Sequence, residues 1–395
     1  MKALEFNGSG SEYFKIWIVN ILLTIVTLGL YYPWAKVRNN RYFYANTTLD
    51  GRNFEYHAVG KQLFIGYLIA MSLLITYVVI QKIFPMGSLI LLALLFLAIP
   101  WVIVRSMMFN MRMTSFSNVR FEFTGKLKNA YINFFAYPLA LYIGFIALYL
   151  ILIKGMSMGG FVSGVLAIVL FVALPAFMLY GLAFIKKKNT EYFINNINYG
   201  QGVFRTNLEI KNLVSIALQV VVIALVAFAI TLFTVGLISY LSVGLESLLG
   251  LSNVGQDPAV LKHKMSTIIP IITAIYGGMI FSMIFVTAYS LTKHRAYIYA
   301  NTILDENISF ESTLKALPFA WVLISNLLMI IFTLGLATPW AKVRTAKIMS
   351  ENTLVKANDG FDDYISQKQT QTSSLGEQIG DAFDVDVGAG VGIGL

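Results

Sequence analysis

The stretch NILLTIVTLGLYYPWAKVR, residues 20–38, decides the fold, because most of it returns as NLLMIIFTLGLATPWAKVR at residues 326–344. Each copy is an apolar run that ends in Pro-Trp-Ala-Lys-Val-Arg. Self-similarity within a chain indicates that it is built from repeated structural units. The apolar run that contains each copy is long enough to cross a bilayer. We therefore predict that related helices make the first and the last membrane crossing.

The composition is typical of a polytopic membrane protein. Of the 395 residues, 57% are hydrophobic and only 12% are charged, against about 25% charged residues in soluble domains. There is no Cys, and the three His residues show no metal-ligand spacing, so we expect no cofactor, no metal site and no enzymatic activity. The net charge is +9, and the basic residues lie beside the apolar runs. This pattern predicts contact with the lipid bilayer and its anionic lipids, and no binding of nucleic acid.

Eight apolar runs predict an all-α fold with about eight transmembrane helices. They lie near residues 15–34, 62–81, 84–104, 130–153, 161–185, 212–242, 267–291 and 316–340. Lys and Arg concentrate in the connections 36–61, 105–128, 186–211 and 293–315, which the positive-inside rule places in the cytoplasm. Eight crossings then put both termini outside, where the basic residues after the second motif copy are unfavourable. In the alternative topology, both motif copies are re-entrant and both termini are cytoplasmic.

The basic connections are themselves repeats within one membrane domain, residues 1–364. The repeated modules cover residues 33–60, 100–125, 186–207 and 293–313, and each contains a turn signal such as Asp50-Gly51 between β-rich segments. Such a pattern predicts small cytoplasmic β-hairpins between helix pairs. An isolated hairpin is marginal in water, so these hairpins are expected to pair with each other or to pack on helix ends.

The two ends of the chain differ from the repeated core. Leu4-Glu5-Phe6 resembles Phe121-Glu122-Phe123, the second strand of a module, and Asn352-Thr353-Leu354 resembles a first strand. Residues 365–395 are polar at first and acidic later, which predicts a disordered tail. In one interpretation the tail is only frayed, and in the other it docks on a protein partner.

Few polar residues lie inside the predicted spans, and they are the candidate site. Asn20 and Asn326 occupy equivalent places in the two motif copies, and Thr24 lies one turn beyond Asn20. They either line a pathway or hold helices together by hydrogen bonds. Proline interrupts a helix, so we expect the helices to kink or unwind around the glycine four residues before each proline. These pairs are Gly29 with Pro33 and Gly335 with Pro339.

Aromatic and basic residues at the ends of three spans are expected to anchor the helices at the membrane interface. They are Trp34, Lys36 and Arg38, Trp101 and Arg105, and Trp340, Lys342 and Arg344. A further cluster, Lys186-Lys187-Lys188, either binds anionic lipid head groups or stops membrane transfer.

The run EYFKIWIVNILLTIVTLGLYYPWAKVRNNRYFYANTTLDG, residues 12–51, resembles the signature of the YjgN family, bacterial inner-membrane proteins with a domain of unknown function. The resemblance extends over all the spans. It implies a multi-helix fold in the bacterial cytoplasmic membrane, and it implies no reaction and no site residues.

Two functions are compatible with the residues. The first is a transporter or channel-like protein for a small solute, with the first and last spans lining a central path. The second is a membrane scaffold or adaptor, which recruits a protein partner through its hairpins and its acidic tail. Polar residues open to solvent between the Asn20 and Asn326 helices favour transport, whereas a packed apolar centre with exposed hairpins favours the adaptor.

Overall fold

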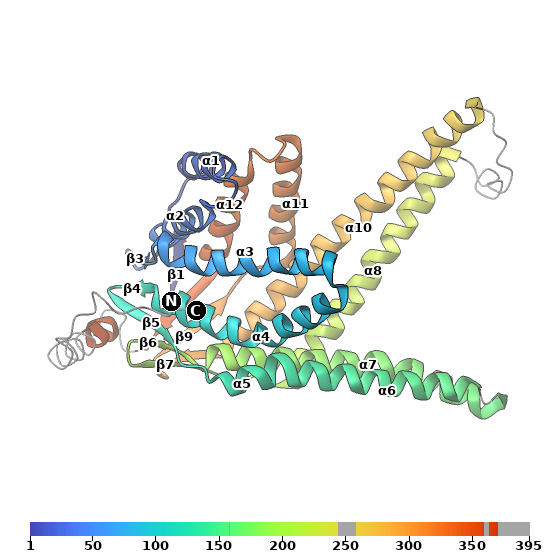
Figure 1. The fold of residues 1–395 in the computed structure, drawn as a ribbon, viewed down its shortest axis with the longest axis horizontal. Helices are drawn as coiled ribbons and strands as arrows, with labels where there is room; N and C mark the ends of the chain where they lie inside the picture. Colours follow the sequence, from blue (N-terminus) through green and yellow to red (C-terminus); the bar gives the residue numbers. More distant parts are fainter. Residues whose placement is uncertain (158, 244–257, 359–362, 370–395) are drawn as a thin grey trace.

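Helical hairpins radiate from a small β-barrel in the computed structural model, which describes residues 1–157, 159–243, 258–358 and 363–369 (Figure 1). Each hairpin begins after one strand and ends before another, so the helices come in pairs. The helices are α1 (Gly10–Val26), α2 (Tyr32–Ala45), α3 (Gly60–Ile83), α4 (Pro85–Arg112), α5 (Leu127–Tyr131), the π-helix η1 (Ile132–Ala136), α6 (Tyr137–Ser157), α7 (Gly160–Ile194), α8 (Ile210–Val243), α10 (Pro258–Ala300), α11 (Ala316–Phe332) and α12 (Thr338–Glu351).

The barrel is closed and antiparallel throughout, with the strand order β1-β10-β9-β8-β7-β6-β5-β4-β3-β2. Four β-hairpins follow one another around it, and β1 pairs with β10 on one side and β2 on the other. The two terminal strands therefore take the place of a fifth hairpin, in agreement with their resemblance to the strands of the repeated modules. The strands are β1 (Lys2–Phe6), β2 (Thr47–Leu49), β3 (Arg52–Tyr56), β4 (Thr114–Phe116), β5 (Val119–Phe123), β6 (Ile197–Tyr199), β7 (Gly202–Thr206), β8 (Thr302–Leu304), β9 (Ile308–Ser312) and β10 (Thr353–Ala357).

The fold is therefore not all-α, although the prediction of β-hairpins between helix pairs is confirmed. Each hairpin pairs with the next through strands that are far apart in sequence, such as Phe54 with Phe116 and Phe121 with Tyr199. Closing the ring leaves no free edge, and a closed sheet removes the marginal stability of single hairpins.

The turns explain why the hairpins form where they do. Asp50 and Gly51 have φ of 55° and 72°, and Ser117 and Asn118 have 49° and 65°. Positive φ at both central residues matches the two-residue turn whose twist fits a hairpin.

Gly51→Ala is expected to lower the free energy of unfolding by about 1–2 kcal/mol, because an L side chain is strained at positive φ. No atom lies within 4 Å of a Cβ placed at Gly51, so the backbone alone causes the loss. Thermal unfolding of the purified protein in detergent measures it. The matched control is Gly66→Ala in α3, where a Cβ also has no atom within 4 Å. Helix propensity predicts that this variant raises the free energy of unfolding by up to about 1 kcal/mol. Equal effects of the two variants would contradict this reason.

Apolar side chains fill the barrel. Its core includes Leu49, Phe116, Tyr199, Leu304 and Val355, one from each short strand or from β10. The long strands add Leu4, Phe54, Phe121, Phe204 and Phe310. Neighbouring rings make contact around the barrel, with centroids 4.6 Å apart for Phe54 and Phe116 and 5.8 Å for Phe204 and Phe310. The barrel is thus a packed core, as is usual for barrels of small diameter.

The motif copies form hairpins of two short helices, not single kinked spans. At the first tip the Gly29 N–H donates to Thr24 O (2.7 Å), Leu28 and Gly29 have positive φ, and the Tyr31 N–H donates to Thr27 Oγ1 (3.0 Å). The Gly29 bond and the positive φ resemble a helix stop of the Schellman type. Pro33 then lies in the first turn of α2, where its missing N–H costs nothing.

The second copy repeats this geometry. The Gly335 N–H donates to Ile330 O (2.8 Å), and the Ala337 N–H donates to Thr333 Oγ1 (2.9 Å). The runs 15–34 and 316–340 are therefore wrong as single spans. Of the two predicted outcomes, a kink or unwinding around the glycine, the structure has the second, and the proline begins a new helix.

Within the described residues, six helices are long and apolar enough to cross a membrane, in place of the predicted eight. They match the six predicted runs between 62–81 and 267–291. Arg105 lies about 20 residues from the start of α4, which is about 30 Å of helix and the thickness of the hydrocarbon core. Arg344 lies only about six residues, or about 9 Å, from the start of α12. The short hairpins thus reach only part of the way across.

The barrel also decides the relative position of the termini. Because β1 and β10 pair with each other and with the strands of the basic connections, both ends of the described chain lie on the side of those connections. The predicted placement of the termini on the opposite side is therefore wrong. The geometry agrees with the re-entrant alternative, in which the basic residues Lys342 and Arg344 also lie on the basic side.

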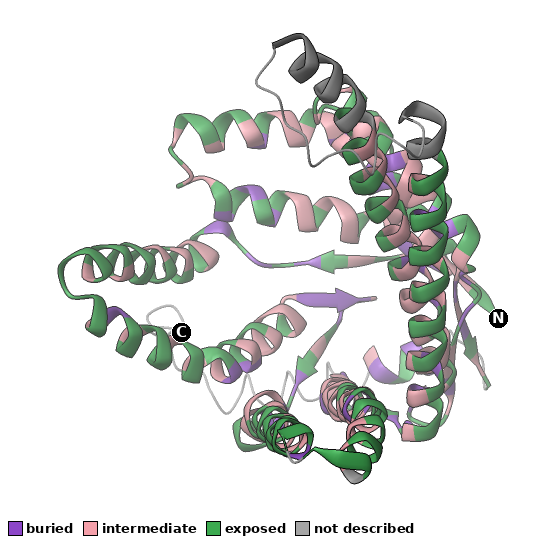
Figure 2. Ribbon diagram, turned by 90° about the vertical axis from the view of Figure 1, so that its right-hand side faces the viewer, coloured by how far each residue is buried: buried purple, intermediate pink, exposed green. Residues whose placement is uncertain are grey.

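The hairpins form a ring around the barrel, each packed on its neighbours in the chain (Figure 2). The ring closes where α12 packs on α1. At the tips of the α1–α2 and α11–α12 hairpins, the described chain leaves two leucines uncovered: Leu28 is 92% exposed and Leu334 is 94% exposed. Apolar side chains so exposed indicate contact with lipid.

Candidate functional site: the helix bases around the barrel mouth

Asn20 and Asn326 each stabilise their own hairpin. Asn326 is buried, and its Nδ2 donates to Ala341 O and to Thr345 Oγ1, both at 3.1 Å. Its Oδ1 accepts from Arg344 Nη1 at 3.0 Å. The amide therefore joins α11 to α12 and fixes the guanidinium at the same time.

The first copy has the same network. Asn20 Nδ2 donates to Asn39 Oδ1 at 3.0 Å and to Ala35 O at 3.5 Å, while Arg38 Nη1 donates to Asn20 Oδ1 at 3.2 Å. The two Asn residues thus have the geometry of helix–helix hydrogen bonding within a hairpin, not of a site shared between the copies.

The other predicted residues of this group lie in the same hairpins. The Thr24 hydroxyl donates to Asn20 O (2.6 Å) inside α1. Gly29 and Gly335 form the tips, with φ of 91° and 93°. Pro33 and Pro339 are fully buried at the start of α2 and α12.

The predicted anchors pack between neighbouring hairpins. The Trp34 ring lies 5.0 Å from Phe64 of α3, and the Trp340 ring lies 5.2 Å from Phe14 of α1. Gly60 allows this approach, because a Cβ there would come 2.3 Å from the Trp34 ring. Lys36 and Lys342 are exposed.

A cation recurs at the same place in the second helix of every hairpin. The five residues are Arg38, Arg105, Lys188, Lys293 and Arg344, which we call the cationic ring. An aromatic residue precedes each of them by one helical turn. Arg105 lies 5.9 Å from the Trp101 ring, Lys188 5.8 Å from Phe184, and Lys293 5.7 Å from Tyr289. This aromatic and basic level is typical of a membrane interface. Three of these pairs are among the predicted anchors, whereas Phe184 with Lys188 and Tyr289 with Lys293 are not.

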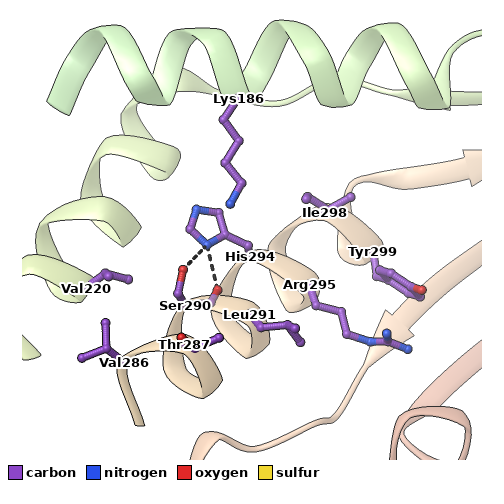
Figure 3. A pocket seen from close by; sticks show the side chains of 10 residues that line it. All are labelled: Lys186, Val220, Val286, Thr287, Ser290, Leu291, His294, Arg295, Ile298 and Tyr299. Atoms are coloured by element: carbon purple, nitrogen blue, oxygen red, sulfur yellow. Dashed lines mark hydrogen bonds between the residues drawn. The ribbon is translucent and has the colours of Figure 1, made fainter. Parts of the chain in front are cut away.

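A cavity of about 600 Å³ lies between α7, α8 and α10, next to the barrel (Figure 3). Its polar lining includes Lys186, Ser290 and His294. His294 Nδ1 lies 2.7 Å from Ser290 O. Since a carbonyl only accepts, Nδ1 carries the proton, and Nε2 is left for another partner. No sequence pattern connects Lys186 with the other two, because Lys186 lies on α7 and Ser290 and His294 lie on α10 of the next hairpin.

A short helix, residues 363–369, covers the end of the barrel formed by the hairpin turns. Tyr364 and Ile365 are buried against the barrel core. Gln369 Nε2 donates to Ser117 O at 2.7 Å. The predicted disordered tail is therefore wrong at its start, where two buried side chains, Tyr364 and Ile365, and the hydrogen bonds of this helix to the hairpin turns offset the loss of chain entropy. The predicted docking segment beyond it, residues 370–395, lies outside the described residues.

Asp305 in the β8–β9 turn holds this helix. Its Oδ2 accepts from Lys368 Nζ at 2.7 Å and from the Tyr364 hydroxyl at 2.9 Å, and its Oδ1 accepts from the Val203 N–H at 2.8 Å. Burial alone would raise the pKa of Asp305, but these three bonds outweigh it and bring the pKa below its ordinary value of 3.8.

Docking of residues 363–369 is expected to weaken in acid. A carboxyl whose pKa is lowered by folding contributes stability above its unfolded pKa, and this contribution is lost as the pH falls through the folded pKa. Hydrogen-exchange protection of residues 363–369 should therefore be full at neutral pH and fall below about pH 4. Asp305→Asn should lower the protection already at neutral pH. Unchanged protection in that variant would show that Asp305 does not hold the helix.

Within the described part of the chain, no three His, Asp or Glu side chains are grouped so that they could hold a metal ion.

Comparison with known proteins gives the family. The inner membrane protein YjgN of Salmonella typhimurium is 28% identical over 376 residues, covering 94% of this chain and 93% of that protein. The YjgN proteins of Escherichia coli O157:H7 and K12 are 33% and 31% identical over 170 and 169 residues, which is 42% of each chain. No solved structure matches the chain significantly. The family model described as "Bacterial protein of unknown function (DUF898)" matches residues 1–382. The chain is an inner membrane protein and belongs to the DUF898 family.

Proposed function

We propose that this inner membrane protein is a scaffold, which holds a rigid β-barrel at the cytoplasmic surface for a protein partner. The observation that carries the proposal is the barrel itself. Its centre is packed with aromatic and aliphatic side chains such as Phe116 and Tyr199, and residues 363–369 cover its far end. Because the barrel is filled and covered, a solute cannot pass through it, and its outer surface is the part that can contact a partner. The proposal assigns the chain no enzymatic activity.

The charged residues on the outer surface of the barrel favour a partner of opposite charge. The position directly after the inward Leu or Phe is exposed in each of five long strands. These residues are Glu5, Glu55, Glu122, Arg205 and Glu311, which we call the outer belt. Successive side chains of a strand point to opposite faces, so these residues face outward. Four carboxylates around one rim favour a partner with a basic surface.

Site-specific photo-crosslinking in native membranes tests the scaffold. Asn53 is exposed and lies two residues before Glu55 on β3. A photo-crosslinking residue at position 53 should give one discrete protein adduct, and the adduct should disappear when Glu55 and Glu122 are both changed to Lys. The matched control is the same crosslinker at Leu28 on a hairpin tip, which should give lipid adducts only. No adduct at position 53, or an adduct that survives the charge reversal, would contradict the proposal.

Transport of a small solute is the second candidate, and one observation favours it. A groove of about 820 Å³ runs between α10 and the α11–α12 hairpin, and Asn326, Lys342 and Thr345 contribute to its lining. Current through planar bilayers that contain the purified protein tests this candidate. A conductance that changes with Thr345→Val favours a channel, whereas bilayers as silent as protein-free ones favour the scaffold.

A further inference from the structure

The cavity between α7, α8 and α10 has a basic end and an apolar end (Figure 3). Lys186 and His294 lie at the basic end, with the Lys186 amino group beside the imidazole ring. Val220 and Val286 lie at the other end. Val286 precedes His294 by about two turns of α10, so the apolar end lies about 12 Å further from the barrel. The cavity is therefore amphipathic along the direction in which the helices enter the membrane.

The three lysines at the end of α7 differ in their partners. Lys187 Nζ lies 3.6 Å from Glu191 Oε1, and Lys188 Nζ lies 4.0 Å from Glu191 Oε2. Lys186 faces the cavity instead, and none of the described residues that line the cavity is acidic. Because Lys186 and His294 lie together without an acidic partner in the lining, a ligand with negative charge would stabilise this arrangement.

The neighbouring guanidinium of Arg295 is already engaged by the protein. Its Nε donates to Ser312 Oγ (3.1 Å), its Nη2 donates to Met349 O (3.1 Å) and to Thr353 Oγ1, and it lies 4.6 Å from the Tyr299 ring. Arg295 thus joins α10 to α12 and the barrel. The donor left for a ligand is the Lys186 amino group, and His294 Nε2 also faces the cavity because Nδ1 is fixed by Ser290 O. Nε2 donates only when the imidazole takes up a second proton.

We propose that this cavity binds the phosphate group of an anionic phospholipid, with Lys186 and His294 on the phosphate and an acyl chain along Val220 and Val286. A phosphate supplies acceptor oxygens for the cationic amine of Lys186, and its negative charge favours a second proton on His294, whose Nε2 then donates as well. Such charge-assisted bonds are the stronger ones. The apolar end accounts for the acyl chain, which a free phosphate ion lacks. The basic end lies at the level of the cationic ring, where the head groups of the barrel-side leaflet are expected.

Native mass spectrometry of the full-length protein from nanodiscs of phosphatidylcholine and phosphatidylglycerol tests the site. The wild type should retain phosphatidylglycerol, and Lys186→Gln should lower its occupancy about tenfold, the effect of one charge-assisted hydrogen bond. The matched control is Lys187→Gln, which removes an adjacent lysine that pairs with Glu191 and should retain the lipid as the wild type does. Retention by Lys186→Gln equal to that of the wild type would overturn the proposal.

A second variant distinguishes loss of the lipid site from loss of folding. It also distinguishes a phospholipid from a soluble phosphate as the ligand. Val286→Trp fills the apolar end and leaves Lys186 in place, so it should release phosphatidylglycerol while the thermal unfolding midpoint stays near that of the wild type. Inorganic phosphate is added in a parallel series. If inorganic phosphate binds the wild type and Val286→Trp equally and displaces the lipid, the ligand is a soluble phosphate and the assignment to a phospholipid is wrong.

Discussion

Phe116→Ala is expected to lower the free energy of unfolding by about 3–5 kcal/mol, the usual cost of removing a buried aromatic ring. Phe116 is buried in the barrel, with its ring 4.6 Å from Phe54 and 6.3 Å from Tyr199. The Phe116 ring contacts side chains of β3 and β6, which belong to two other β-hairpins. Its loss therefore leaves a cavity in the core of the barrel, to which all the helical hairpins are connected. Thermal and denaturant unfolding in detergent measures the effect.

The control for this prediction is Phe171→Ala. Phe171 lies in α7 and is 75% exposed, so detergent or lipid surrounds its ring. Its removal should change the free energy of unfolding by no more than about 0.5 kcal/mol, as is usual for surface positions. If both alanine variants lost the same stability, the barrel would not be the core that holds the helical hairpins together.

Asn326→Ala is expected to cost about 2–3 kcal/mol, since it removes the amide that joins α11 to Ala341 O and Thr345 Oγ1 of α12 and takes one acceptor from the Arg344 guanidinium. The diagnostic measurement is a double-mutant cycle. Asn326→Ala and Arg344→Gln should be strongly non-additive, because they remove the same hydrogen bond. Asn326→Ala and Arg38→Gln should be additive, because these residues share no partner. Coupling in the second pair would indicate one site common to both copies, as a transport pathway requires.

The sequence predicted the hairpins well, because their signals are local. Asp50-Gly51 and Ser117-Asn118 specify a tight turn by backbone geometry alone. The closure of the barrel depends on contacts such as Phe121 with Tyr199, between strands whose register no local signal specifies. The paired fragments at Leu4 and Leu354 were the one hint that the ring closes.

The misassigned spans have an equally local cause. A proline after an apolar run is compatible with a kinked helix and with the first turn of a new one. What decides between them here is Thr27, whose hydroxyl caps the tip, together with Leu28 and Gly29 at positive φ. The Thr-Leu-Gly step occurs in both copies, but the membrane spans were predicted from the length of the apolar runs, which carries no information on turn geometry. The cavity at Lys186 and His294 had no such signal, since its residues meet only in the folded chain.

The central claim is that both terminal strands and all hairpin turns lie on one side of the membrane, with the two short hairpins entering the bilayer without crossing it. Because the chain has no Cys, single cysteines can be introduced without other changes. Cysteines at Lys2, Gln201 and Glu306 test the barrel, one at Leu28 tests a short tip, and one at Lys154, near the tip of a long hairpin, is the external control.

In intact cells, a thiol reagent that cannot cross the inner membrane should label the cysteine at position 154 and none of the others. After the inner membrane is opened, positions 2, 201 and 306 should all be labelled, while position 28 stays protected by lipid. Labelling of position 2 from outside, together with protection of position 201, would place the N-terminus across the membrane from the hairpins and would contradict the barrel.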